Sequence, residues 1–163
     1  MATRKPLVIG DNGIPEQIRP ADDLEVNLTA VNTIALENDE GGAMAFLSPV
    51  YLSDNDKIIR AKADAIGTSK VIGIIYPAAI VGGTGLVAID GILTATAGEW
   101  DTVCDESIAS GLTFGTYYFL SPTNAGKITS TPPTTANHCV VLLGQAVSAT
   151  RLKLSSPLIP ILL

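Results

Sequence analysis

The chain has 163 residues, of which 47% are hydrophobic and only 16% are charged, and its formal net charge is −6 at pH 7. Its ten basic residues are scattered, so it lacks the Lys/Arg footprint that nucleic-acid phosphates require, and an acidic surface is disfavoured on anionic lipids. We therefore expect neither nucleic acid nor membrane as a partner. Soluble domains carry about 25% charged residues, so the low charge indicates self-association or docking on a large assembly.

Two segments raise the question of targeting. The start MATRKPLVIG is basic, but its apolar stretch lasts only four residues before Asp11-Asn12-Gly13, which does not match a signal peptide. The apolar run 71–89 is long enough to be compared with a transmembrane span. Because Pro77 and four glycines interrupt it, we interpret it as two buried strands around a turn. We expect synthesis and folding in a cytoplasm.

The predicted elements are almost all strands, because no window has a clear helical apolar face while Thr, Val and Ile are abundant. Segments 6–10 and 14–18 flank a DNG turn and predict an arm-like hairpin or extended segment. The clearest alternation lies in LEVNLTA, residues 24–30, within a long strand-like segment 24–36. Further strands are predicted over 43–53 (interrupted by Pro49), 57–63, 70–80, 85–95, 116–121, 127–131, 139–149 and 151–156, with 98–115 as a loop that contains at most one helical turn near 105–109.

One sequence phrase occurs twice. YLSDNDKII at 51–59 and YYFLSPTNAGKIT at 117–129 both place an aromatic residue and Leu-Ser before a polar turn and Lys-Ile. Each is followed by an apolar run that ends in glycine, at Gly73 and Gly144. Chance similarity of β-turns is the alternative. We predict a mainly β fold, a β-barrel or jelly-roll-like sandwich built from two related β units near 43–95 and 112–163, within one domain over 21–163 that follows an extended N-terminal arm, residues 1–20.

The sequence contains few features that indicate a catalytic, phosphate-binding or metal-binding site. His138 is the only histidine, no GxSxG motif surrounds a serine, and Gly82-Gly83-Thr84-Gly85 lacks the Lys-Ser/Thr of a phosphate loop. The acidic turn at 54–57 resembles the start of a calcium loop but has neither its glycine nor its closing glutamate, so a solvated hairpin tip is the preferred interpretation. We predict that the protein is not an enzyme and uses no cofactor or metal.

Three residues remain as candidates for other roles. Trp100 is a possible interface or loop anchor, with packing beneath the loop as the default. Cys104 and Cys139 lack metal-ligand spacing and are either partly buried free thiols or a disulfide within or between chains.

The order of motifs resembles a β-rich module of tailed-bacteriophage virion proteins. The resemblance lies in GLTFGTYYFLSPTNAGKITSTPPTT (111–135), VVLLGQAVSATRLKL (140–154) and the final PILL. VYLSDNDKIIRAKA, VIGIIYPAAIVGGTGLVAIDGILT and Trp100 extend it over about 43–163. Each motif has low specificity alone, and their order carries the likeness.

The resemblance implies a capsid decoration (cement) protein, of a family whose members include barrel or jelly-roll trimers that contact neighbours through an N-terminal arm. It implies the major capsid protein and further copies of the chain, as a homotrimer, as partners, and the virion capsid surface as location. The alternative is a tail-fibre or baseplate tip that binds a host receptor or glycan. The residues assigned to the docking arm are Arg4, Lys5, Pro6, Leu7, Val8, Ile9 and Ile14.

Overall fold

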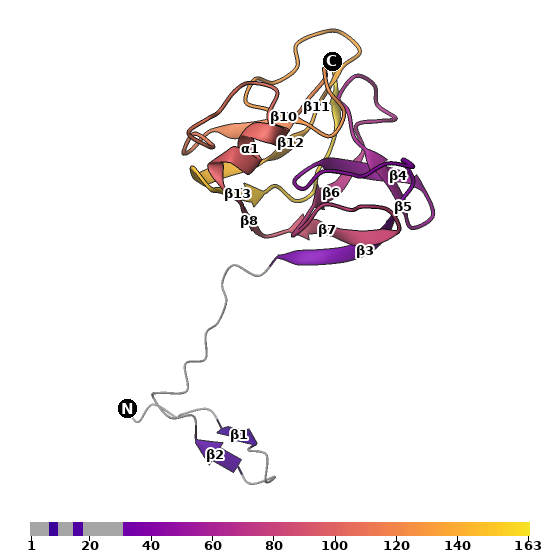
Figure 1. Ribbon diagram of the computed structural model, residues 1–163. Helices are drawn as coiled ribbons and strands as arrows, with labels where there is room; N and C mark the ends of the chain where they lie inside the picture. Colours follow the sequence, from indigo (N-terminus) through magenta and orange to yellow (C-terminus); the bar gives the residue numbers. More distant parts are fainter. Residues whose placement is uncertain (1–6, 10–14, 18–30) are drawn as a thin grey trace.

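The protein is mainly β and contains a closed five-stranded barrel and additional sheets (Figure 1). The computed structural model describes residues 31–163 and, before them, the backbone of 7–9 and 15–17. The elements are β1 (Leu7–Ile9), β2 (Pro15–Gln17), β3 (Asn32–Asn38), β4 (Pro49–Asp54), β5 (Lys57–Arg60), β6 (Val71–Ile75), β7 (Thr84–Asp90), β8 (Ile92–Thr94), α1 (Ala97–Val103), β9 (Tyr117–Leu120), β10 (Ile128–Thr129), β11 (Cys139–Val140), β12 (Leu142–Ser148), β13 (Arg151–Leu154) and β14 (Ile161–Leu162).

The barrel has the strand order β3-β5-β4-β6-β7 and closes through β3 and β7. All its pairs are antiparallel except β3 with β5, which are parallel. Closure leaves fewer free strand edges, which would otherwise pair with other chains. Apolar side chains of the barrel strands, joined by Met44 and Ile80 from the connecting segments, fill the interior, as expected for small barrels. This cluster consists of Leu36, Met44, Val50, Ile58, Ile75, Ile80 and Val87, all buried.

The second half of the chain forms an open sheet with the order β10-β9-β12-β13-β8. Its inner face contributes Tyr118, Leu120, Leu143 and Leu152 to the core, at the alternate positions that period-2 geometry predicts. The short strands β11 and β14 form a separate antiparallel pair.

The two sequence repeats occupy equivalent structural positions. In the first, β4 lies between β5 and β6, and in the second, β9 lies between β10 and β12, with every pair antiparallel. The registers agree residue by residue, because Leu52 pairs with Ile58 as Leu120 pairs with Ile128. Likewise Gly73 faces Val50, and Gly144 faces Tyr118. The prediction of a fold built from two related β units is confirmed.

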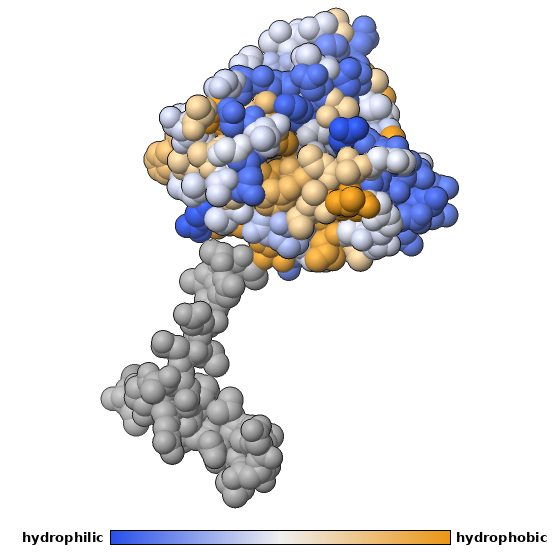
Figure 2. Space-filling view, in the orientation of Figure 1, coloured by the Kyte–Doolittle hydropathy of each residue, from blue (hydrophilic) through white to orange (hydrophobic). Residues whose placement is uncertain are grey.

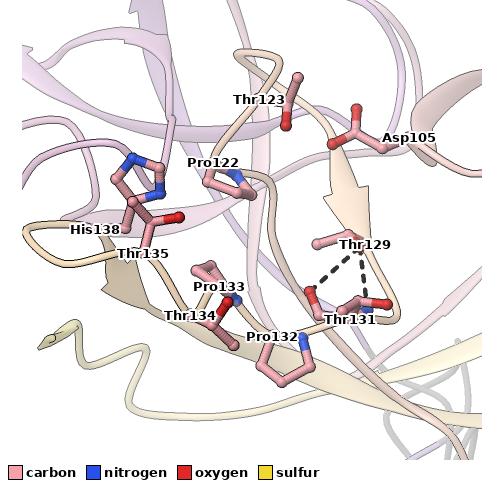
Figure 3. A pocket seen from close by; sticks show the side chains of 10 residues that line it. All are labelled: Asp105, Pro122, Thr123, Thr129, Thr131, Pro132, Pro133, Thr134, Thr135 and His138. Carbon is pink, nitrogen blue, oxygen red and sulfur yellow. Dashed lines mark hydrogen bonds between the residues drawn. The ribbon is translucent and has the colours of Figure 1, made fainter.

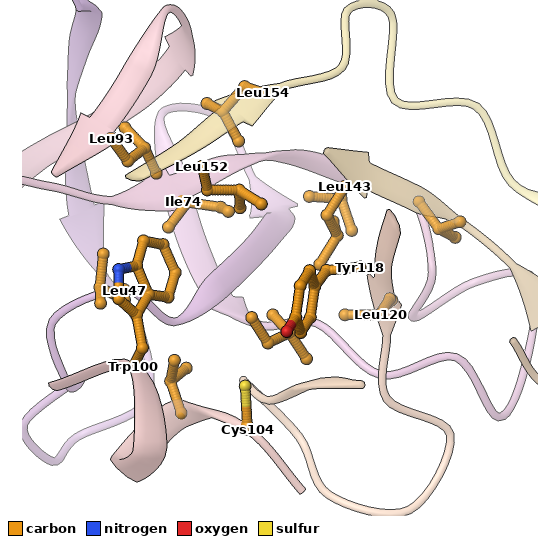
Figure 4. Packing of buried hydrophobic residues seen from close by; sticks show 14 of the residues in the cluster. Leu47, Ile74, Leu93, Trp100, Cys104, Tyr118, Leu120, Leu143, Leu152 and Leu154 are labelled. Atoms are coloured by element: carbon orange, nitrogen blue, oxygen red, sulfur yellow. The ribbon is translucent and has the colours of Figure 1, made fainter. Parts of the chain in front are cut away.

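The barrel and the open sheet share one hydrophobic cluster. It includes Leu47, Ile74 and Ala88 from the barrel side and Tyr118 and Leu143 from the sheet, all buried (Figure 4). Burial at roughly 25 cal/mol per Å² of apolar surface makes this shared core the main stabilising term.

Four predicted boundaries were wrong. The predicted strand 139–149 is divided at Val141, so that β11 pairs with β14 while β12 lies in the open sheet. Segment 98–115 begins with helix α1 rather than a loop, because Thr96 and Glu99 form a capping box in which the Thr96 side chain accepts from the Glu99 N–H and the Glu99 carboxylate accepts from the Thr96 N–H at 2.7 Å. Pro49 begins β4 instead of interrupting a strand over 43–53. The run 85–95 is divided at Gly91, whose φ of 115° sends β7 into the barrel and β8 into the sheet.

The predictions for the N-terminal part fall mostly outside the described residues. Backbone pairing of Leu7 with Gln17 and Ile9 with Pro15 forms the antiparallel hairpin expected around the DNG turn. The predicted strand 24–30 and the remainder of the arm lie outside the described part. Over 71–89 the chain forms β6 and β7, and among the described residues no helix is long and apolar enough to cross a membrane.

The close approach of strands at the two equivalent glycines gives a stability prediction. A Cβ on Gly73 would lie 2.2 Å from the Ala88 carbonyl oxygen, and one on Gly144 would lie 2.3 Å from that of Lys153. We expect Gly73→Ala and Gly144→Ala each to lower the free energy of unfolding by roughly 1–3 kcal/mol through overpacking. Urea denaturation measures the free energy of unfolding of each variant. Gly67→Ala is the control, since no atom lies within 4 Å of its added Cβ; an equal loss in all three variants would contradict the account.

Candidate functional site

Trp100 is a core anchor. Helix α1 places its side chain, which is fully buried, in the cluster shared by barrel and sheet (Figure 4). The indole Nε1–H donates to the Thr150 carbonyl oxygen at 3.2 Å, so the polar group of the ring is satisfied. Trp100 therefore fixes α1 to the loop before β13, and its burial leaves no ring surface for an interface or ligand.

Both cysteines are buried free thiols, so neither takes part in a disulfide within the chain. Cys104 ends α1, where its N–H donates to the Trp100 carbonyl at 3.1 Å. Burial, and then the charges of Glu106, Asp101 and Asp105, raise the pKa of the Cys104 thiol to about 12. A thiol of this kind is a poor nucleophile at neutral pH.

His138 lies beside a hollow of about 350 Å³ that is lined mainly by threonine and proline (Figure 3). Within the described part of the chain its Nδ1 is buried without a hydrogen-bond partner. Asp105 also borders the hollow, but its carboxylate already accepts from Ser121 and from Asn124 Nδ2, the latter at 2.7 Å. The polar groups here mostly hold the β9–β10 turn. The lining residues are Asp105, Pro122, Thr123, Thr129, Thr131, Pro132, Pro133, Thr134, Thr135 and His138.

The outer face of the open sheet carries the aromatic and cationic groups. Gln145 is the cross-strand partner of both Tyr117 and Lys153, so these three side chains share one face. Tyr117 is 51% exposed, and Phe114 in the preceding loop is 78% exposed. The Gln145 amide donates to the Gly115 carbonyl at 2.9 Å and fixes this loop on β12. We call Tyr117, Gln145, Arg151 and Lys153 the cationic strip.

Sequence reasoning missed part of this surface. Tyr117 and Tyr118 are adjacent in sequence, but adjacent strand residues point to opposite faces, and Tyr118 is buried with its hydroxyl accepting from the Thr113 N–H. Phe114 and the outward Arg151 and Lys153 were not singled out. The alternation RLKL in 151–154 was the available signal, because Leu152 and Leu154 had to be the core residues.

The opposite group of charges is the acidic tip, which we define as Glu37, Asp39, Asp54 and Asp56 around Lys57. Lys57 Nζ lies 3.5 Å from an Asp39 carboxylate oxygen and 3.9 Å from one of Glu37. Exposed pairs of this kind contribute little stability, about 0–1 kcal/mol. In residues 31–163 no group of three or more His, Cys, Asp and Glu side chains is arranged to hold a metal ion.

No protein-family model matches the chain, and no curated protein matches its sequence.

The buried state of Cys104 gives a prediction about reactivity and pH. We expect both thiols to resist alkylation in the native protein at pH 8 and to react fully in guanidinium chloride. The Cys104 thiol ionises near 9.0 when unfolded and near 12 when folded, so rising pH favours the unfolded state and stability falls across that interval. Urea titrations at several pH values measure the fall, which Cys104→Ala should reduce. Rapid native labelling of Cys104 would contradict its burial.

Proposed function

We propose that the protein is a bacteriophage capsid decoration (cement) protein that binds the outside of the head as an oligomer, a homotrimer, and stabilises the shell. The observation that carries the proposal is exposed apolar surface on a chain with little charge. Around β14, Ile159, Ile161, Leu162 and Leu163 are 46–63% exposed, although alternation along a strand would bury half of them. Several exposed apolar side chains within one short segment are typical of protein contacts.

The position of the resembling residues supports the same proposal. The segments that resemble the phage module form β9, β10, β12 and β13, together with the barrel strands β4–β7. They therefore make up the framework of the molecule, and their loops also line the hollow beside His138. A framework that carries the likeness is consistent with a structural protein of the virion.

The mechanism is linkage between binding and shell stability. A protein that binds the assembled, expanded shell and not its separate subunits stabilises the shell by its binding free energy, about 2.7 kcal/mol per site when its free concentration is 100 times the dissociation constant. The apolar residues around β14 would supply area, and the arm of residues 1–20, with Arg4 and Lys5 at its start, would add contacts.

A tail-fibre or baseplate tip that binds a host receptor or glycan is the second candidate. Exposed Phe114 and Tyr117 favour it, since exposed aromatic rings can stack on sugars. The buried Trp100 and Tyr118 do not contribute to such a platform.

The proposal predicts binding to heads. The protein should co-sediment with expanded phage heads that lack decoration and raise the temperature at which they lose DNA, because it binds only the assembled lattice. The double variant Ile161→Asp, Leu162→Asp should bind at least tenfold more weakly, since it places charge in the apolar contact. Val81→Asp is the matched control, an exposed apolar residue of the β6–β7 loop. Binding to host cells or glycans without binding to heads would favour the tip.

Deletion of residues 2–20 tests the arm separately. We expect loss of head binding, while circular dichroism and size remain those of a folded oligomer, because the barrel and the shared core lie within 31–163. Unaltered binding by this variant would exclude the arm as an anchor.

A further inference from the structure

The cationic strip is electrostatically unsatisfied within its own chain. Arg151 and Lys153 lie two residues apart on β13 and therefore point to the same outer face of the sheet. Lys57, Arg60 and Lys62 form ion pairs with carboxylates, whereas Arg151 and Lys153 have no such partner among residues 31–163. Two free cations on an acidic protein indicate a surface that is complementary to an anionic partner.

The acidic tip carries an excess of negative charge. The hairpin between β4 and β5 and the end of β3 bring its four carboxylates to one end of the barrel. Hydrogen bonds from the Ser53 hydroxyl to Asp39, 2.9 Å, and from the Glu37 N–H to the Asp56 carbonyl, 2.8 Å, fix the hairpin against β3. Only Lys57 neutralises these carboxylates, since Arg60 is bound to Glu40 at 2.6 Å. Negative charge therefore gathers on a narrow, protruding turn.

The two surfaces cannot meet within one molecule. Figure 1 places β13 and β8 at one side of the protein and the β4–β5 hairpin at the other. Figure 2 shows hydrophilic residues gathered at the hairpin end, with more hydrophobic surface between the two sides. A contact between them requires two copies of the chain.

We propose that the acidic tip of one copy docks on the cationic strip of a second copy. A hollow of about 140 Å³ is lined by Tyr117, Gln145 and Lys153, together with Leu142, Gly144, Leu154 and Ser155. The tip offers a shape that fits, because Asp56 adopts a φ of 54° and turns the chain sharply. The carboxylates of Asp54 and Asp56 then approach Lys153 and Arg151.

Apolar groups beside both charged surfaces supply the centre of the contact. Leu52 is 46% exposed next to the acidic tip, and Tyr117 and Phe114 are exposed next to the strip. Stable interfaces combine an apolar, aromatic centre with a charged rim. Buried apolar area would then hold the copies together, and the charges would select the register.

The contact joins two different surfaces and is therefore heterologous. In a pair of copies, one copy still has a free acidic tip and the other a free cationic strip. Such contacts propagate until a ring closes. The size of the ring, three copies, rests on the proposed function, while the contact itself does not.

Charge reversal tests the contact. Arg151→Glu with Lys153→Glu, and separately Asp54→Lys with Asp56→Lys, should each raise the dissociation constant of the oligomer at least roughly tenfold, because like charges then face each other. An equimolar mixture should regain association between unlike variants, since the two reversed surfaces complement each other, while a ring of three copies would keep one contact between like variants. Sedimentation velocity in 50 mM and 500 mM NaCl measures both effects, and salt should weaken the wild-type oligomer. Lys70→Glu, an exposed cation of the β5–β6 loop, is the control and should associate as wild type.

Several outcomes would overturn the contact. These are a monomeric wild-type protein at all concentrations, unchanged association of both reversed variants, or variants that are folded by circular dichroism but fail to associate when mixed. Head co-sedimentation separates the two proposals. Oligomers that respond to charge reversal but ignore heads would contradict only the decoration role. Head-binding oligomers that ignore charge reversal would contradict only this contact.

Discussion

The structure depends on the core that the barrel and the open sheet share. Chain segment 61–63, just after β5, is the joint, because backbone hydrogen bonds tie it to the second unit at three points. The Ala63 N–H donates to the Ser121 carbonyl at 2.8 Å, and the Ala63 carbonyl accepts from Cys139 at 2.9 Å. The Gly126 N–H donates to the Ala61 carbonyl at 2.8 Å. Neither unit alone could cover its apolar face, so the two halves stabilise each other.

The repeat could be predicted from sequence because strand geometry constrains a few positions strongly. Gly73 and Gly144 recur because a neighbouring strand passes too close for a side chain, and the Leu–Ile pairs recur because the hairpin register is the same. Helix α1 was missed because seven residues are too few to show helical periodicity. Its capping box, Thr96 with Glu99, was nevertheless readable. The division at Gly91 depends on which sheet each strand joins, and local sequence does not contain that information.

The surface was harder to predict than the core, because long-range packing determines which face of a strand is exposed. Alternation shows that Tyr117 and Tyr118 face opposite ways, but the buried face is determined by segments far away in sequence. Trp100 was rightly named as a residue to examine, and its packing and its hydrogen bond to Thr150 depend on a loop that lies fifty residues later in the chain. The role of the charged residues was even harder to predict from the sequence. Asp54 and Asp56 were interpreted as a solvated tip, which fits their exposure, and only the position of β13 makes them complementary to another surface.

The two proposals place shell binding and self-association on different parts of the molecule. The apolar residues around β14 lie in the pair with β11, outside both the cationic strip and the acidic tip. A decoration protein needs this separation, since contacts between copies must remain intact while the assembly is bound. Each copy would add its shell contacts at high effective concentration once a first copy is bound, so weak individual sites can give strong binding. Charges between copies would make assembly selective, while apolar surface on the shell side would supply most of the affinity.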